Sequence, residues 1–378
     1  MLLKITNQAR EYAWGSRTLI SDYFGIPATG APMAEIWFGT HDGSPSQLSD
    51  GSGTLTQKLG RSLPFLLKIL AADSPLSIQA HPDSVQAKVG FDQENAKGIG
   101  LSSPSRNYKD EHHKPELIVA VTDFEALAGF KPLADIQQLF SDLADHQGVS
   151  AGFRTMATNW LNLLGEPDGL RKLFLSIAGS RSNLDGFNAE LASLAEGEAR
   201  FALAERLNLL HPGDPGVVMA LLMNHVYLDP GEALFLDAGK PHAYLQGLGI
   251  EVMASSDNVL RGGLTQKHVD VAELEKIIKF ESSEQLVIHP KEISKGLFHY
   301  ECEAEDFNVY RAELSGSVVM ADLNLPGESI VLCAAGEVAL SNSIDEREVL
   351  RRGEAAYLAA DSKRFTLAGS GTAFIATA

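Results

Sequence analysis

Residues 65–70 read FLLKIL, and residues 117–121 read LIVAV. Apolar runs this short, bounded by turn residues, are typical of buried strands in a sandwich or barrel. Strand-like segments with turn signals such as Asp229-Pro230-Gly231 return from Asn224 and continue to Ala378. The sequence therefore predicts a mainly β protein.

The hydrophobic period changes in the middle of the chain. Apolar residues at positions 133, 136, 139, 140 and 143 follow the spacing of an amphipathic helix, and those at 184, 187, 191 and 194 repeat it. This block ends near His211-Pro212-Gly213. We therefore expect residues 131–211 to form a helical insertion between residues 1–130 and 212–290, with residues 291–378 as a C-terminal β domain.

Composition and charge limit the classes of partner. The chain has 378 residues and a net charge of −18, which opposes nonspecific binding to nucleic acid or anionic membranes. It has no signal-peptide-like apolar region and no span of the ~18 apolar residues that a membrane helix needs. Its two cysteines, Cys302 and Cys333, fit a reducing compartment. We expect a cytoplasmic monomer that binds neither nucleic acid nor membranes and takes a small-molecule substrate.

Three short motifs carry candidate metal ligands: residues 77–83 (SIQAHPD), 114–116 (KPE) and 240–244 (KPHAY). In an extended strand alternate side chains share a face, so Gln79 and His81 can both point at one ion. Glu116 would add a carboxylate and His242 a second imidazole, which gives a set of N and O ligands without thiolate. An isolated histidine is more often a satisfied core residue, so the prediction depends on the three motifs occurring together.

Three cations outside these motifs are candidates for substrate binding. Lys68 interrupts an apolar run, and a buried lysine costs free energy unless it is paired or faces a cavity. Arg261 lies within the polar, glycine-rich stretch of residues 251–263 and Lys267 follows it, and both side chains can bind phosphate through charge-assisted hydrogen bonds. The alternative for Arg261 is an ordinary surface residue in a solvated turn.

The C-terminal part contains an internal echo. Residues 228–238 (LDPGEALFLDA) resemble residues 350–360 (LRRGEAAYLAA), and in this register His242 falls opposite Arg364. The echo is either a duplicated β unit whose second copy lacks the metal ligand, or a chance match between two turn-plus-strand sequences.

Taken together, these motifs resemble those of the type I mannose-6-phosphate isomerases, also called phosphomannose isomerases. The matching blocks cover essentially the whole chain: residues 12–15 (YAWG), 34–41 (AEIWFGTH), 63–68 (LPFLLK), 76–83 (LSIQAHPD), 113–116 (HKPE), 241–244 (PHAY) and 254–261 (ASSDNVLR). The resemblance implies two cupin-type jelly rolls plus an α-helical domain. Residues 1–130 and 212–290 would form the metal-binding jelly roll, and residues 291–378 the one without metal. The chain departs from the family at Gly262 and Gln266, where Ala and Pro are common.

The resemblance also implies an activity and a set of site residues. It implies a zinc-dependent aldose-ketose isomerase, with one Zn²⁺ per chain, that interconverts mannose 6-phosphate and fructose 6-phosphate through an enediol. The implied metal ligands are Gln79, His81, Glu116 and His242. The implied catalytic residues are Arg261, Lys114, His113, Glu251, Asp257 and His41. The implied substrate-binding residues are Trp14, Glu35, Lys68, Ser77, Tyr244 and Lys267.

The sequence leaves the proton-transfer base open among Glu251, His41, His113 and the lysines, because reach to the migrating proton is a geometric question. Two other functions use the same features. An Fe(II) cupin dioxygenase expects a 2-His-1-carboxylate set, and the additional glutamine argues against it. A sugar-binding regulator on the same scaffold is disfavoured because the four ligands and Arg261 are all retained.

Overall fold

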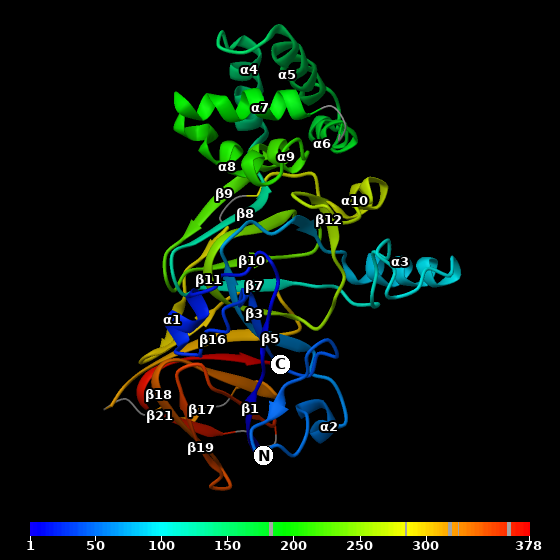
Figure 1. Cartoon of the computed structure of the whole chain (residues 1–378). Coiled ribbons are helices and arrows are strands. Elements are labelled where there is room, and N and C mark those ends of the chain that lie inside the picture. Colours follow the sequence, from blue (N-terminus) through cyan, green and yellow to red (C-terminus); the bar gives the residue numbers. More distant parts are fainter. Residues whose placement is uncertain (181–183, 284–285, 317–319, 324, 361–363) are drawn as a thin grey trace.

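The computed structural model describes residues 1–180, 184–283, 286–316, 320–323, 325–360 and 364–378. The strands of this part of the chain form two antiparallel groups, and a group of helices lies at one end of the molecule (Figure 1). The fold is therefore mainly β with helices, which confirms the predicted class at that level. None of the helices in the described part of the chain is long and apolar enough to cross a membrane.

The first group of strands is built around β11 (His242–Ala254). Its main path runs β13 (Val287–Ile288), β10 (Ala233–Leu236), β7 (Glu116–Ala120), β11, β5 (Phe65–Ala72), β3 (Glu35–Phe38) and β2 (Ala9–Arg10). Four further strands complete it: β6 (Ile78–Ala80), β8 (Phe124–Phe130), β9 (Met223–Leu228) and β12 (Leu260–Gly263).

Strand β11 changes partners along its length. Its first residues pair with β6 and β8, and from Gly247 onward it pairs with β5 and β7. Gly247 has a φ of +123°, and a Cβ there would lie 2.7 Å from the Asp123 carbonyl oxygen, so only glycine fits this switch. The two halves of β11 therefore serve two strand layers, and His242 lies at the start of the strand.

The second group of strands contains most of the chain after residue 290. Its path runs β14 (Lys291–Ser294), β15 (Leu297–Tyr300), β16 (Asn308–Ser315), β21 (Phe365–Thr377), β18 (Ser329–Asn342), β20 (Ala355–Leu358), β1 (Leu2–Thr6) and β4 (Gln47–Leu48). Strand β17 (Met320–Leu323) pairs with β21, and β19 (Arg347–Arg351) pairs with β18. The N-terminal strand β1 thus pairs with the C-terminal strand β20 on one side and with β4 on the other. In Figure 1 it lies beside the strands of the C-terminal part of the chain.

Six α-helices of the described chain lie between β8 and β9 and form the helical end of the molecule (Figure 1). They are α4 (Leu133–Asp145), α5 (Ala151–Leu164), α6 (Gly169–Gly179), α7 (Asp185–Ser193), α8 (Ala202–Leu210) and α9 (Gly216–Leu222), with short 3-10 turns at Leu194–Glu196 and Ala199–Phe201. In α4 the predicted spacing buries Ile136, Phe140 and Leu143 on one face. The helix α9 lies beyond residue 211 and is buried along its whole length. Four other helices lie elsewhere in the chain: α1 (Leu19–Phe24), α2 (Leu55–Leu59), α3 (Ser84–Ala96) and α10 (Val271–Ile277).

Two apolar cores hold these layers together. One joins the two strand groups, because it contains Ile69 and Val119 from the first and Ile330 and Leu332 from the second. The other packs the helices against the strands that carry the candidate ligands, through residues such as Ile78. Burying a side chain of this size contributes roughly 1.5–3 kcal/mol, so both contacts are substantial. The candidate site is therefore set in strands that are packed on both sides.

The internal echo corresponds to two strands in the same register. Strand β10 begins at Ala233 and β20 at Ala355, which occupy matching positions of the two repeated segments. Arg364, which falls opposite His242 in this register, is exposed. The match therefore extends from sequence to local backbone structure.

Candidate active site

Strand pairing brings the predicted ligands together from distant parts of the sequence. His242 of β11 lies opposite Gln79 of β6, and Arg261 of β12 lies opposite the same Gln79. Glu116 begins β7 and lies opposite Met253 of β11. These strands form the wall of a cavity of about 620 Å³.

His81, Glu116 and His242 form a compact buried cluster. One potential ligand atom from each lies within 4.8 Å of the other two. The Nε2 atoms of His81 and His242 are each 3.4 Å from an oxygen of Glu116, Oε1 and Oε2 respectively. All three side chains are almost fully buried. Gln79 lines the cavity beside them, so the four predicted ligands lie in one place.

Backbone carbonyls fix the orientation of both imidazoles. His81 Nδ1 lies 2.7 Å from the Asn258 carbonyl oxygen, and His242 Nδ1 lies 2.9 Å from that of Lys240. A carbonyl oxygen only accepts, so each Nδ1 carries the proton and each Nε2 presents its lone pair to the cluster. Both Nε2 atoms are buried without a hydrogen-bond partner in the described structure. An unsatisfied buried polar atom costs about 1–3 kcal/mol, and a bound divalent cation would remove this cost.

The charge states of the cluster suit a metal. Burial, with the nearby Lys114 ammonium, lowers the pKa of His81 to about 4, so this imidazole is neutral at physiological pH. Burial alone would raise the pKa of Glu116, but the Lys114 ammonium holds it well below its usual range. Lys114 Nζ lies 2.8 Å from Glu116 Oε1. Neutral imidazoles and an ionised carboxylate are the ligand forms that zinc binds.

One wall of the cavity holds a buried lysine between two carboxylates. Lys68 Nζ is 2.8 Å from Glu251 Oε2, 3.8 Å from Glu35 Oε1 and 5.1 Å above the Trp37 ring. Burial alone would lower the pKa of Lys68, but the two carboxylates raise it, so the ammonium stays charged. Burial raises the pKa of Glu251, and Glu116 and Glu35 add to this while Lys68 opposes it.

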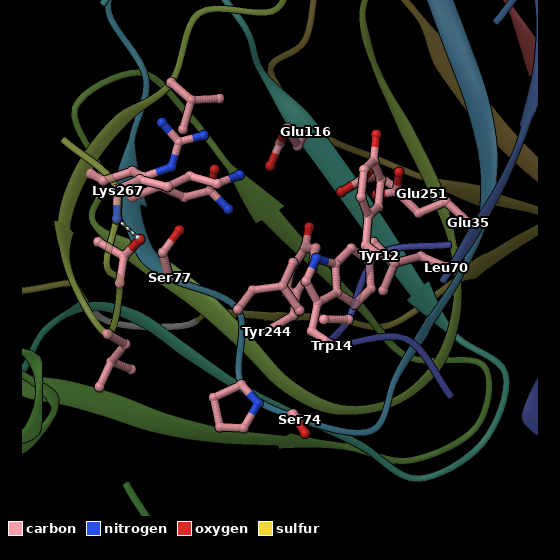
Figure 2. Close-up of a pocket in the computed structure, with 18 of the residues that line it drawn as sticks. Tyr12, Trp14, Glu35, Leu70, Ser74, Ser77, Glu116, Tyr244, Glu251 and Lys267 are labelled. Carbon is pink, nitrogen blue, oxygen red and sulfur yellow. Dashed lines mark hydrogen bonds between the residues drawn. The ribbon is translucent and has the colours of Figure 1, made fainter. Parts of the chain in front are cut away.

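The opposite wall holds cations without carboxylate partners. Figure 2 shows Lys267 and Ser77 on one side of the cavity, and Glu35 and Glu251 on the other. Within the described chain, neither the Arg261 guanidinium nor the Lys267 ammonium forms an ion pair. Burial lowers the pKa of Arg261, and burial together with Arg261 lowers the pKa of Lys267. Partly buried, unpaired cations on the lining of a cavity favour binding of an anion.

His41 and Asp257 form a further pair on the lining. His41 Nδ1 accepts a hydrogen bond from the Gly43 backbone N–H at 3.1 Å, so Nε2 carries the proton and faces Asp257 Oδ1 at 3.3 Å. Burial alone would raise the pKa of Asp257, but His41 lowers it.

Of the predicted residues, His113 alone belongs neither to the lining of this cavity nor to the buried cluster. Its Nε2 is 2.8 Å from Asp306 Oδ2, which raises the pKa of His113. With His112 it lines a second cavity of about 640 Å³ that adjoins the first at His41 and Asp257.

The structure adds residues that sequence reasoning missed. Tyr12 lies on the lining with its ring stacked on Trp14 at a centroid distance of 5.7 Å, and His211 reaches the lining from the end of the helical region. Asn258 orients His81 through its carbonyl oxygen. Tyr12 and Asn258 lie within the blocks that carried the resemblance, but no local signal pointed to His211.

Comparison with known proteins adds to this geometry. Residues 2–133 match the family described as phosphomannose isomerase type I, catalytic domain. The chain is 35% identical over 393 residues to mannose-6-phosphate isomerase of Salmonella typhimurium, covering 97% of each chain. It is 30% identical over 398 residues to the human mannose-6-phosphate isomerase, covering 93% of this chain and 92% of that one. It superposes on a zinc-bound mannose 6-phosphate isomerase crystal structure with a TM-score of 0.88 and 33% identity, over 100% of this chain and 99% of that chain.

Proposed function

The chain belongs to the type I phosphomannose isomerase family, and from this premise we propose that it interconverts mannose 6-phosphate and fructose 6-phosphate with one zinc ion. The observation that carries the proposal is that one site contains both buried imidazole nitrogens without a hydrogen-bond partner and cations without a carboxylate partner. The buried His81 and His242 Nε2 atoms lack a cation, and the Arg261 and Lys267 side chains lack an anion. A metal-dependent enzyme for a phosphosugar supplies both.

We propose that Gln79, His81, Glu116 and His242 hold the zinc ion. The donor set supports this, since it consists of two fixed imidazole lone pairs, an ionised carboxylate and an adjacent amide. When bound, zinc supplies a Lewis acid without redox chemistry, which polarises a sugar carbonyl oxygen.

The cationic wall would orient the substrate and balance its charge. Lys267 is proposed to bind the phosphate group, with Ser77 as a neighbouring hydroxyl. Arg261 lies opposite Gln79 on the paired strand, close to the proposed metal ligands, and is proposed to stabilise negative charge on the enediol oxygens.

The proton transfer is assigned to Glu251. In the open-chain aldose, Glu251 takes the proton from C2 and returns it to C1, while the O2 hydroxyl proton moves to O1. A carboxylate whose pKa is raised by burial is well matched to this role, and Lys68 fixes one of its oxygens. Lys114 and His41, both on the lining, are the candidates for moving the hydroxyl proton.

An isotope experiment tests the enediol route. A proton held by Glu251 can exchange with water during the lifetime of the intermediate, so the reaction in D₂O should place deuterium on the hexose carbon. A direct hydride shift places none. Product free of solvent deuterium after many turnovers in both directions would count against the enediol and against Glu251 as base.

The activity is tested by measuring fructose 6-phosphate formed from mannose 6-phosphate with zinc-loaded protein and with protein stripped of metal. We expect turnover only with the metal. Binding of the sugar phosphate without turnover would instead indicate a regulator, and oxygen consumption with Fe(II) a dioxygenase.

We further propose that the two strand groups correspond to two cupin-type jelly rolls. Antiparallel pairing of the assigned strands and the shared register of β10 and β20 support this.

A further inference from the structure

The end of the helical region is joined to the loop that follows β12. Asp214 is buried, and its Oδ1 accepts hydrogen bonds from the backbone N–H groups of Gly216 at 2.7 Å and Leu264 at 2.8 Å. Its Oδ2 accepts from the Thr265 N–H at 3.4 Å. One carboxylate therefore holds two segments that are about fifty residues apart in the sequence.

The backbone at this junction is strained and closely packed. Leu264 has a φ of +54°, a conformation that costs a non-glycine residue on the order of 1–3 kcal/mol unless its surroundings enforce it. A Cβ on Gly216 would lie 2.5 Å from the Leu264 nitrogen, and a Cβ on Gly263 would lie 2.6 Å from the Gly216 Cα. The two backbones are thus in direct contact, and Asp214 satisfies the N–H groups of the strained turn.

The strained turn lies between the two unpaired cations. Arg261 precedes it and Lys267 follows it, and Leu264 itself lines the cavity. His211, from the same short segment as Asp214, also lines the cavity. The position of the Lys267 ammonium therefore depends on a turn that is fastened from the helical region.

We propose that Asp214 is a positioning residue for anion binding, which holds the turn at Leu264 so that Lys267 faces the phosphate group of the substrate. The inference rests on the proposed function only for the identity of the anion. The competing interpretation is that Asp214 merely stabilises the end of the helical region. If Asp214 is a positioning residue, its loss weakens phosphate binding even when the variant is fully folded. If it only stabilises the fold, phosphate affinity of the folded variant is unchanged.

The test compares Asp214→Asn with a matched buried carboxylate, Glu328→Gln. Asparagine keeps the shape, but its amide offers one acceptor oxygen in place of two to the backbone N–H donors of Gly216, Leu264 and Thr265. Glu328 accepts hydrogen bonds from Tyr357 and Arg61, which lie away from this junction. With zinc-loaded Asp214→Asn we expect KM for mannose 6-phosphate to rise about tenfold and kcat to stay within about twofold. The Kd of inorganic phosphate, measured by titration calorimetry, should rise by the same factor. Glu328→Gln should lower Tm and leave KM and Kd unchanged.

A second variant reaches the same turn without touching the carboxylate. Gly216→Ala places a Cβ against the Leu264 nitrogen and should also raise the Kd of inorganic phosphate, which keeps the test decisive if Asp214→Asn does not fold. An unchanged phosphate Kd in the folded variants, or an equal rise in Glu328→Gln, would overturn the proposal. If the wild-type protein does not isomerise the sugar but binds phosphate in an Asp214-dependent manner, the proposed function fails and this inference stands.

Discussion

Both walls of the cavity carry positive charge, but on one wall this charge is paired with carboxylates and on the other it is not. On one wall Lys68 is buried between Glu251 and Glu35, and its charge is balanced within the protein. On the other wall Arg261 and Lys267 face the cavity with no carboxylate partner in the described structure. The charge of Lys68 is therefore balanced by carboxylates of the protein itself, whereas the charges of Arg261 and Lys267 would be balanced only by a bound anion.

The cluster of His81, Glu116 and His242 shows the opposite imbalance, because its electron-pair donors lack a cation. Glu116 and the two Nε2 atoms present electron pairs to a point where the described residues supply only Lys114 Nζ as a nearby cation. The site thus has donors that can bind a cation and cations that can bind an anion. Either group can be removed by substitution without changing the other. Single substitutions therefore change one wall of the cavity at a time.

Removal of a proposed metal-binding histidine should have the largest effect. We expect His81→Ala to lower kcat/KM by a factor on the order of 10³ or more and to reduce zinc content, because the Lewis acid is lost. Chelation should lower the Tm of the wild type and not that of the variant, since metal bound only to the folded state adds to its stability. His225→Ala, which removes a histidine paired with Glu125 outside the cluster, is the control and should retain zinc. Full activity of metal-free protein would contradict the prediction.

Removal of the paired lysine should act on stability first. Lys68→Met leaves Glu251 and Glu35 buried without their counter-ion, and breaking a buried pair in this way costs about 3–5 kcal/mol. The measurement is the free energy of unfolding in urea. A loss below about 1 kcal/mol would mean that the carboxylates are balanced from elsewhere.

Removal of the unpaired arginine should show the reverse pattern. We expect Arg261→Ala to lower kcat by a factor on the order of 10², because charge developing on the oxygens of the proposed enediol would lose its partner. Its stability and zinc content should stay near those of the wild type, since no buried counter-charge is left behind. Urea unfolding and metal analysis beside steady-state kinetics separate the two effects, and destabilisation equal to that of Lys68→Met would erase the distinction between the walls.

Loss of the Lys267 charge should affect substrate affinity alone. We expect Lys267→Gln to raise KM about tenfold with kcat within about twofold, and to weaken inhibition by inorganic phosphate by the same factor. Lys131→Gln, a change at a partly buried lysine outside the cavity lining, should leave both constants unchanged. A fall in kcat without a change in phosphate inhibition would assign Lys267 to the chemical step instead.

Most residues predicted from the sequence lie around one cavity, because the signals that selected them are local. The parity of Gln79 and His81, the lone lysine in FLLKIL and the period change at residue 133 each report the environment of a single strand or helix. The spacing predicted α4, and the motifs predicted the cluster of His81, Glu116 and His242.

The rest depends on contacts between distant segments. Nothing in residues 1–10 indicates that β1 pairs with β20, because a strand carries no local mark of its partner. The same holds for the Asp214 contact with Leu264, and for His113, which neighbours the metal-binding motif in sequence but turns to Asp306. The proposed domain boundaries and monomeric state stay predictions.

The smallest effect concerns this His113–Asp306 pair, which links the segment before β7 to the segment before β16 and therefore joins the two strand groups. Asp306 raises the pKa of His113 above its usual value. A raised folded-state pKa contributes stability that is fully present below the unfolded pKa near 6.5 and is lost as pH rises through the folded pKa. Asp306→Asn should therefore lower the free energy of unfolding relative to the wild type at pH 5.5 and not at pH 9, by less than about 1 kcal/mol because the pair is partly exposed.

The same variant decides whether His113 belongs to the cavity. Since His113 is absent from the lining, Asp306→Asn should leave kcat and KM within about twofold of the wild type at neutral pH. A double-mutant cycle with His113→Gln isolates the coupling free energy between the two side chains. This coupling should fall to zero at pH 9, where His113 is neutral. A large fall in kcat for Asp306→Asn would place His113 in the catalytic machinery and move the boundary of the site toward the C-terminal strands. Coupling that persists at pH 9 would instead show a hydrogen bond from the neutral imidazole to Asp306.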